Sequence, residues 1–209
     1  MSKILYIESS PRKERSHSIK MANAFLNFYK QAHPNDQVET LDLWKTKLPP
    51  FDGDTINAKY TVLHSQKPEA KQAEAWRVVE EMVKHFASAD KYVFSIPMWN
   101  FGIPYILKHY IDILTQPGLT FTFSPEKGYD GLIKNKPAVI VYASGGTYGE
   151  NSGAKALDYQ KPYFELWLKF IGFTSIQEII VDGTLADKNT FETTLKTATQ
   201  QAEKLAKTF

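Results

Sequence analysis

The chain has 209 residues, 43% of them hydrophobic, which suffices for one compact α/β domain and is too few for two of comfortable size. Its 25 Lys and Arg residues nearly balance its 23 Asp and Glu residues, so no strong field favours nucleic acid or an anionic membrane as a partner. The absence of cysteine excludes disulfides, thiolate catalysis and cysteine-ligated metal centres. We therefore predict a single domain over residues 1–209 that uses non-thiol chemistry and binds neither nucleic acid nor membrane.

The N-terminal region carries no visible targeting segment. Its apolar run, residues 4–7, is too short for the hydrophobic region of an export signal. Nowhere in the sequence do about 18 apolar residues run together, as a helix that spans a bilayer requires. We expect a soluble, cytoplasmic protein.

Apolar runs of strand length alternate with helical periodicities, which is typical of a parallel sheet covered by helices on both faces. The first unit is a strand at residues 4–7 and a helix at 18–31 with apolar residues at helical spacing. Residues 38–43 alternate apolar and polar, as in a second strand at the edge of the sheet. Residues 44–67 show no clear period and form either a structured excursion or a lid.

The rest of the chain repeats this rhythm. An amphipathic helix at 71–88 precedes a buried strand at 91–96, which ends at Pro97. A short run at 119–123 between two turn signals indicates a hairpin arm outside the main sheet. The remaining predicted elements are helices at 105–114, 161–171 and 191–207 and strands at 138–143 and 176–181.

Five strands with crossover helices suit a doubly wound parallel sheet of order 2-1-3-4-5. In such a sheet the ligand binds outside the carboxyl ends of the strands that flank the switch point. The loops after the first, third and fourth strands are therefore the candidates for a binding site.

The loop after the first strand is rich in serine. It places Ser10, Ser16 and Ser18, with His17, beside the start of the first helix, where free backbone N–H groups favour an anion. Ordinary N-capping accounts for Ser16 or Ser18 but not for the other residues of the loop. No glycine-rich dinucleotide or P-loop motif follows the strand, so the loop indicates a phosphate site for a mononucleotide.

The loop after the third strand gathers aromatic, amide and thioether groups. Pro97, Met98, Trp99, Asn100 and Phe101 follow the strand directly. Such a loop can pack against a flat heteroaromatic ring while its amide and backbone groups bind the polar edge of that ring. The alternative is a turn between prolines whose aromatic side chains belong to the core.

The loop after the fourth strand begins Ser144-Gly145-Gly146-Thr147-Tyr148. Its glycines permit a ligand to approach the backbone closely, and Tyr148 can cover that ligand. A flexible turn is the simpler interpretation of this loop alone. Three such loops at neighbouring strand ends predict one crevice.

Together these residues resemble the FMN-dependent NADH:quinone oxidoreductase and azoreductase family of flavodoxin-like proteins. Residues 1–12 with Ser16-His17-Ser18 are similar to the phosphate loop of that family, and Met98-Trp99-Asn100-Phe101 to its flavin-ring loop. Ser144-Gly145-Gly146-Thr147 resembles its third flavin segment, although some relatives carry Arg where this chain has Ser144. The resemblance covers essentially the whole chain.

The resemblance implies a homodimer with one FMN per subunit and substrate pockets completed by the partner chain. It implies ping-pong chemistry in which NADH reduces the flavin and the flavin reduces a quinone or an azo compound, with no acid–base dyad in the protein. Azo cleavage to two amines takes two such cycles. Asn100 is the candidate for hydrogen bonds to N5 or the pyrimidine edge, and Phe101, Tyr148, Phe121 and Phe123 are candidates for the substrate slot.

The five histidines are scattered without the spacing of metal ligands, so no metal site is expected. The main alternative function is a flavodoxin-like electron carrier without a substrate pocket, although such carriers tend to be strongly acidic. An FAD-using quinone reductase and a serine hydrolase are two further alternatives. The hydrolase lacks the usual G-x-S-x-G motif. The sequence alone decides neither the physiological substrate nor the preference for NADH over NADPH.

Overall fold

The computed structural model describes residues 1–64 and 69–209. Its central element is a five-stranded parallel sheet in the order β2-β1-β3-β6-β7. This is the predicted order 2-1-3-4-5 of a doubly wound domain. The strands are β1 (Lys3–Glu8), β2 (Gln37–Asp42), β3 (Lys91–Pro97), β6 (Pro137–Ala143) and β7 (Ser175–Val181).

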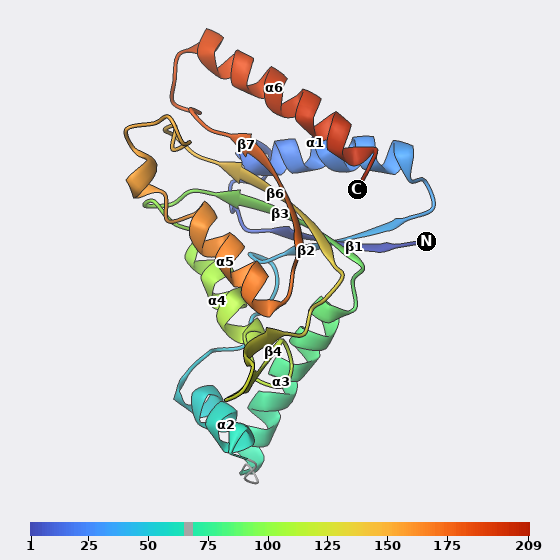
Figure 1. The fold of residues 1–209 in the computed structure, drawn as a ribbon, viewed down its shortest axis with the longest axis vertical. Helices are drawn as coiled ribbons and strands as arrows, with labels where there is room; N and C mark the ends of the chain where they lie inside the picture. The colour runs from blue at the N-terminus through green and yellow to red at the C-terminus, as the bar shows by residue number, and fades with distance from the viewer. Residues whose placement is uncertain (65–68) are drawn as a thin grey trace.

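Helices cover both faces of the sheet (Figure 1). Two of them pack on one face, namely α1 (His17–Ala32) and α6 (Lys188–Ala206). Three pack on the other face, namely α3 (Ala70–Ala87), α4 (Tyr105–Leu114) and α5 (Lys161–Ile171). All five were predicted to within three residues at each end.

The strands supply both cores because successive side chains point to opposite faces. In β1, Ile4 and Tyr6 pack with α1 and α6, whereas Leu5 and Ile7 pack with α3 and α4. A strand that is buried on both faces has no polar alternation, which explains the continuous apolar runs in β1, β3 and β6. The edge strand β2 is less buried than β1, but the predicted alternation with one exposed side is not observed, because Val38 packs against the cluster of α1 and α6 and Leu41 against the cluster on the opposite face.

Two elements lie outside the doubly wound core. The segment 44–67, predicted without a regular period, contains a helix, α2 (Gly53–Leu63). The last residues of this segment, 65–67, lie outside the described residues. The predicted hairpin arm is confirmed as β4 (Phe121–Ser124), which pairs in antiparallel fashion with β5 (Gly128–Gly131). In Figure 1, α2 and this hairpin lie together at one end of the molecule.

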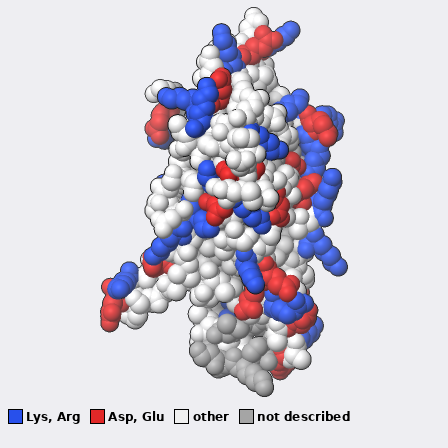
Figure 2. All heavy atoms as spheres, turned by 90° about the vertical axis from the view of Figure 1, so that its right-hand side faces the viewer, with Lys and Arg blue, Asp and Glu red and all other residues white. Residues whose placement is uncertain are grey.

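Within the described part of the chain, no helix has the length and apolar character needed to cross a membrane. On the face shown in Figure 2, Lys and Arg side chains alternate with Asp and Glu side chains. No extended patch of one sign forms on that face, in agreement with the net charge of +2.

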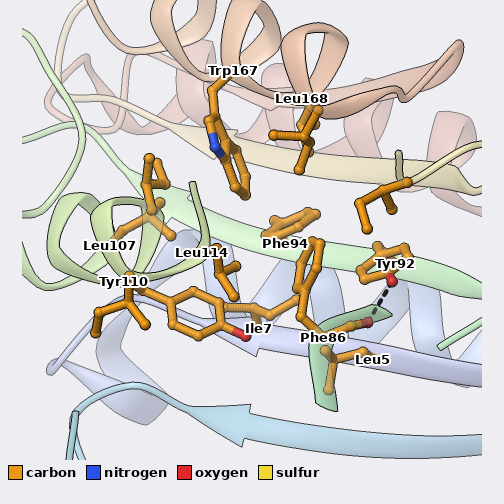
Figure 3. Packing of buried hydrophobic residues seen from close by; sticks show 14 of the residues in the cluster. Leu5, Ile7, Phe86, Tyr92, Phe94, Leu107, Tyr110, Leu114, Trp167 and Leu168 are labelled. Atoms are coloured by element: carbon orange, nitrogen blue, oxygen red, sulfur yellow. Dashed lines mark hydrogen bonds between the residues drawn. The ribbon is translucent and has the colours of Figure 1, made fainter. Parts of the chain in front are cut away.

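Two buried tyrosines in the same core cluster differ in their hydrogen bonding (Figure 3). The Tyr92 hydroxyl donates to the carbonyl oxygen of Phe86 at 2.5 Å. The Tyr110 hydroxyl has no hydrogen-bond partner among the described residues, and burial raises the pKa of Tyr110, which keeps it neutral. A buried polar group without a partner lowers stability by about 1–3 kcal/mol.

We therefore expect Tyr110→Phe and Tyr92→Phe to change stability in opposite directions. Tyr110→Phe should raise the free energy of unfolding by about 1 kcal/mol, because it removes an unpaired hydroxyl, and Tyr92→Phe should lower it by about 1 kcal/mol, because it removes a hydrogen bond. Urea unfolding of the two variants measures both values. Equal destabilisation by the two substitutions would contradict the different environments of the hydroxyls.

Candidate functional site

The carboxyl ends of β1, β3 and β6 lie next to one another, because the three strands are neighbours in the sheet. Hydrogen bonds connect the loops that follow them. The backbone N–H and the hydroxyl of Ser9 both donate to the carbonyl oxygen of Ser95, at 3.3 and 2.8 Å. The N–H of Met98 donates to the carbonyl oxygen of Ala143 at 2.7 Å. The three loops therefore form one continuous edge, as the predicted crevice requires.

The loop after β1, residues 9–16, is called the serine loop, and it leads into the start of α1. Ser10, Ser16 and Ser18 are each at most 3% exposed, and the hydroxyls of Ser16 and Ser18 lie 3.1 Å apart. Ser16 occupies the N-cap position, but its side chain makes no capping hydrogen bond. The capping interpretation therefore does not account for this hydroxyl. Two clustered hydroxyls beside the free N–H groups of a helix form an arrangement suited to an anion.

Two basic side chains, Lys20 and Arg12, lie near His17, which follows the serine loop. His17 is the first residue of α1, and its ring lies 4.9 Å from that of Phe191 in an edge-on arrangement. Burial lowers the pKa of His17, and the positive charges of Lys20 and Arg12 lower it further. The imidazole is therefore neutral at pH 7. The positive charges beside it belong to Lys20 and Arg12.

The loop after β3 folds into a tight two-residue turn. Trp99 and Gly102 exchange two backbone hydrogen bonds of 2.9 Å, and the residues between them, Asn100 and Phe101, have φ angles of 47° and 70°. Such a turn favours Asn at its first position and Gly at its second, so Phe101 is held in a conformation that L-residues avoid. Its carbonyl oxygen accepts the N–H of Tyr159 at 2.9 Å. Strained residues of this kind concentrate at ligand sites.

We expect Phe101→Gly to be more stable than Phe101→Ala. Both substitutions remove the same side chain, which is 46% exposed, so the comparison isolates the backbone. Glycine adopts positive φ without the steric cost of about 1 kcal/mol that a Cβ atom brings. Urea unfolding of the two flavin-free variants measures the difference. Equal stability would mean that the turn relaxes when the phenyl ring is removed.

The loop after β6 is held in place by the segment that follows β7. The carbonyl oxygens of Ser144, Gly145 and Gly146 accept the N–H groups of Thr184, Leu185 and Gly183 at 3.1–3.2 Å. The Ser144 hydroxyl donates to the carbonyl oxygen of Gly146 at 2.8 Å. These bonds argue against a merely flexible turn.

Tyr148 connects the glycine loop to the loop after β3. A Cβ atom added to Gly146 would lie 3.4 Å from the Tyr148 ring, so that ring lies directly over the glycine. Met98, Ser144 and Tyr148 line one cavity of about 190 Å³, together with the start of α5 and the end of β7. The structure thus brings Tyr148 to the predicted flavin residues. Thr147 is exposed at the same loop.

The structure places Phe121 and Phe123 elsewhere. Both belong to the β4–β5 hairpin, where Phe121 contacts Phe170 at 4.8 Å and Phe123 contacts Tyr129 at 5.0 Å between ring centroids. They line a separate cavity of about 860 Å³ with residues of α2. In Figure 1 the hairpin lies away from the edge that carries the three loops. Within one chain, these two candidates therefore do not join the cavity of Tyr148.

Sequence reasoning missed two residues that fix the loops. The indole N–H of Trp44 donates to the carbonyl oxygen of Ser9 at 3.0 Å, and the Trp44 ring lies 6.0 Å from that of Trp99. The buried Gln160 amide donates to the carbonyl oxygen of Ile96 at 3.0 Å. Trp44 follows the predicted second strand directly, a position that could have drawn attention to it. Nothing in the sequence marks Gln160.

Residues 1–64 and 69–209 contain no group of three His, Cys, Asp or Glu side chains that could hold a metal ion. The predicted site residues at this edge offer hydroxyl, amide, aromatic and backbone groups. These groups suit a ligand that combines an anionic end with a flat, polar-edged ring.

Comparisons with known proteins agree with this geometry. The flavodoxin-like fold family matches residues 2–206. The FMN-dependent NADH:quinone oxidoreductase of Desulfotalea psychrophila is 52% identical over 207 residues, which cover 99% of this chain and 97% of the relative. The chain belongs to the family of FMN-dependent NADH:quinone oxidoreductases. A second relative of that name, from Nitratidesulfovibrio vulgaris, is 43% identical and matches over the full length of both chains.

Solved structures give the same assignment. An azoreductase of Bacillus anthracis superposes with a TM-score of 0.92 at 34% identity and matches the full length of both chains. An FMN-dependent NADH-azoreductase of the same species, crystallised in complex with FMN, superposes with a TM-score of 0.85 at 27% identity. That match covers 99% of this chain and 100% of the other. The family resemblance and the flavodoxin-like fold predicted from the sequence are confirmed.

Proposed function

We propose that this protein binds FMN and uses NADH to reduce quinones and to cleave aromatic azo compounds. The observation that carries the proposal is the meeting of three loops at the carboxyl ends of β1, β3 and β6, on a chain of this family. The names of the relatives, quinone oxidoreductases and azoreductases, support the two substrate classes. We also propose that residues 1–209 form one domain and that the protein is cytoplasmic, as expected from the sequence.

The residues at this edge fit FMN. Ser10, Ser16, Ser18 and the first N–H groups of α1, with His17 beside them, would bind the phosphate, because buried hydroxyls and a helix N-terminus favour a dianion. The loop of residues 97–101 would pack against the isoalloxazine ring. Residues 144–147 would approach that ring through their backbone, beside the Tyr148 ring that lies 3.4 Å from the Cβ position of Gly146.

When bound, FMN supplies the redox chemistry by accepting a hydride from NADH and passing two electrons to the second substrate. The protein's own residues bind, orient and shield. Asn100 lies in a turn with a positive φ angle, and its amide would pair with the polar edge of the ring. Met98 and Tyr148 border the cavity in which a flat substrate could lie. No acid–base pair is needed at this edge.

We further propose that the functional unit is a homodimer, with the substrate slot of each subunit completed by the partner chain. The hairpin supports this proposal, because Phe123 and Tyr129 are 61% and 64% exposed and lie beside exposed residues of α2. Contiguous exposed apolar side chains of this kind can mark an interface with another protein. A partner subunit would give Phe121 and Phe123 the slot role that they do not have within one chain.

The visible absorption spectrum tests the proposed function. The purified protein is reconstituted with FMN or FAD and then treated anaerobically with NADH, followed by a quinone or an azo dye. We expect bands that form with FMN, bleach with NADH and return when the second substrate is added. Bands that resist both NADH and NADPH would favour an electron carrier. Failure to bind any flavin would overturn the proposal.

A further inference from the structure

Two carboxylates lie side by side beneath the serine loop. Glu8 and Asp42 are the last residues of β1 and β2, and they are direct neighbours in the parallel register. Their side chains are only 13% and 15% exposed. The Lys13 ammonium lies between them, 3.2 Å from Glu8 Oε2 and 2.5 Å from Asp42 Oδ1. One lysine of the loop thus bridges the ends of two strands.

The backbone of Lys13 is strained at the same point. Its φ angle is 47°, in the left-handed region that residues with a Cβ atom avoid. Such a conformation persists only where the surroundings enforce it. The same residue makes the two ion pairs to Glu8 and Asp42. The position of the Lys13 backbone then matters for the loop, because its carbonyl oxygen accepts the N–H of Ser16 at 2.8 Å.

We infer that Lys13 is a positioning residue for the phosphate of the bound flavin. It does not contact the phosphate itself. By bridging Glu8 and Asp42, it holds the left-handed turn that sets Ser16 in place, and through Ser16 it sets the hydroxyl pair with Ser18. The inference rests on the proposed function, because it assumes that these hydroxyls bind the phosphate of FMN.

A nearby lysine shows what distinguishes Lys13. Lys45 also approaches Asp42, at 3.9 Å, but its side chain is 82% exposed and makes no bridge to β1. An exposed pair of this kind contributes little, whereas a partly buried bridge with two short contacts restrains the chain. Lys45→Met is therefore a matched control, since it removes one positive charge from the same surroundings without cutting the bridge.

The first test compares the affinities of the flavin-free protein for FMN and for riboflavin, which lacks the phosphate. We expect Lys13→Met to weaken FMN binding about tenfold and to leave riboflavin binding within about a factor of two. Lys13→Arg should restore most of the lost affinity, because guanidinium can also bridge two carboxylates. Lys45→Met should change neither affinity. A general loss of structure would weaken both ligands alike.

The second test separates two possible roles of Lys13, namely positioning of the serine loop and electrostatic attraction of the phosphate by its charge. Glu8→Gln with Asp42→Asn keeps the shapes of both side chains but removes the two negative charges that flank Lys13 in the serine loop. If Lys13 acted only through its charge, this double variant would bind FMN more tightly, because less repulsion would remain. If Lys13 positions the loop, the double variant binds FMN more weakly, because the bridge is broken.

The outcomes distinguish the inference from the proposed function. A wild-type protein that is reduced by NADH and prefers FMN to riboflavin, together with an unchanged preference in Lys13→Met, would overturn the inference and leave the proposed function intact. Tighter FMN binding by the double variant would overturn it as well. A wild-type protein that does not discriminate between the two flavins would remove the phosphate site and the inference with it.

Discussion

Replacing Ser10, Ser16 and Ser18 together by Ala should weaken FMN binding by at least about a hundredfold, because hydrogen bonds to a charged group contribute about 1.5–3 kcal/mol each. All three serines are buried, and the hydroxyls of Ser16 and Ser18 lie 3.1 Å apart, so bulk water does not readily replace them at the phosphate. Riboflavin has no phosphate, and its affinity should stay within a factor of about two. Fluorescence titration of the flavin-free variant with each ligand measures both affinities.

A second serine variant controls for the loss of hydroxyls in general. Ser88 and Ser175 lie outside the three loops, at the end of α3 and the start of β7. Their joint replacement by Ala should leave both affinities at the wild-type values. Equal losses of FMN and riboflavin in the triple variant would mean that the serines support the fold of the loop rather than the phosphate.

The doubly wound sheet could be predicted because its strands satisfy one simple rule. A parallel strand that is buried on both faces needs a continuous apolar run, and residues of β1, β3 and β6 provide one each. The amphipathic helices could be predicted from an equally local pattern, the spacing of apolar residues at three and four positions. The edge strand β2 was recognised from its mixture of polar and apolar residues, although Val38 and Leu41 pack on opposite faces of the sheet.

Helix α2 was missed for a physical reason. Its apolar residues Ile56, Tyr60 and Leu63 are 37–53% exposed, so they do not mark a buried stripe, and the small side chains of Thr55 and Ala58 are buried instead. Helical periodicity is read from the contrast between a buried and an exposed face. In α2 that contrast is weak, and contacts with α3 rather than the local pattern stabilise the helix.

The location of the site could be predicted from the sequence, but the hydrogen bonds that hold its loops in place could not. A serine-rich loop between a strand and a helix indicates an anion site by local rules alone, and strand order places the other loops beside it. The bond from Gln160 to Ile96 joins residues 64 positions apart, and that from Trp44 to Ser9 joins residues 35 positions apart. Such contacts exist only in the folded chain. The Asn100–Phe101 turn was hidden because Phe occupies the position that usually carries Gly.

Asn100 is the side chain from which we expect the largest single effect on the flavin ring. Asn100→Ala should leave the fold largely intact and weaken FMN binding about tenfold or slow its reduction, because the polar atoms of the ring would be left without partners. The φ angle of 47° complicates this variant, since Ala tolerates the left-handed region less well than Asn does. A loss in Asn100→Ala alone could therefore come from the backbone.

Asn100→Gly resolves this ambiguity, because glycine adopts the same φ without strain and also lacks the amide. If the amide binds the ring, Asn100→Gly and Asn100→Ala lose FMN affinity to a similar extent, and both lose riboflavin affinity as well, since riboflavin carries the same ring. If Asn100 serves only the turn, Asn100→Gly binds both flavins like the wild-type protein. Unchanged FMN affinity and unchanged steady-state rates in Asn100→Ala would exclude either role. Flavin titrations and NADH-dependent quinone reduction by the two variants therefore decide whether this side chain recognises the ring or shapes the loop that approaches it.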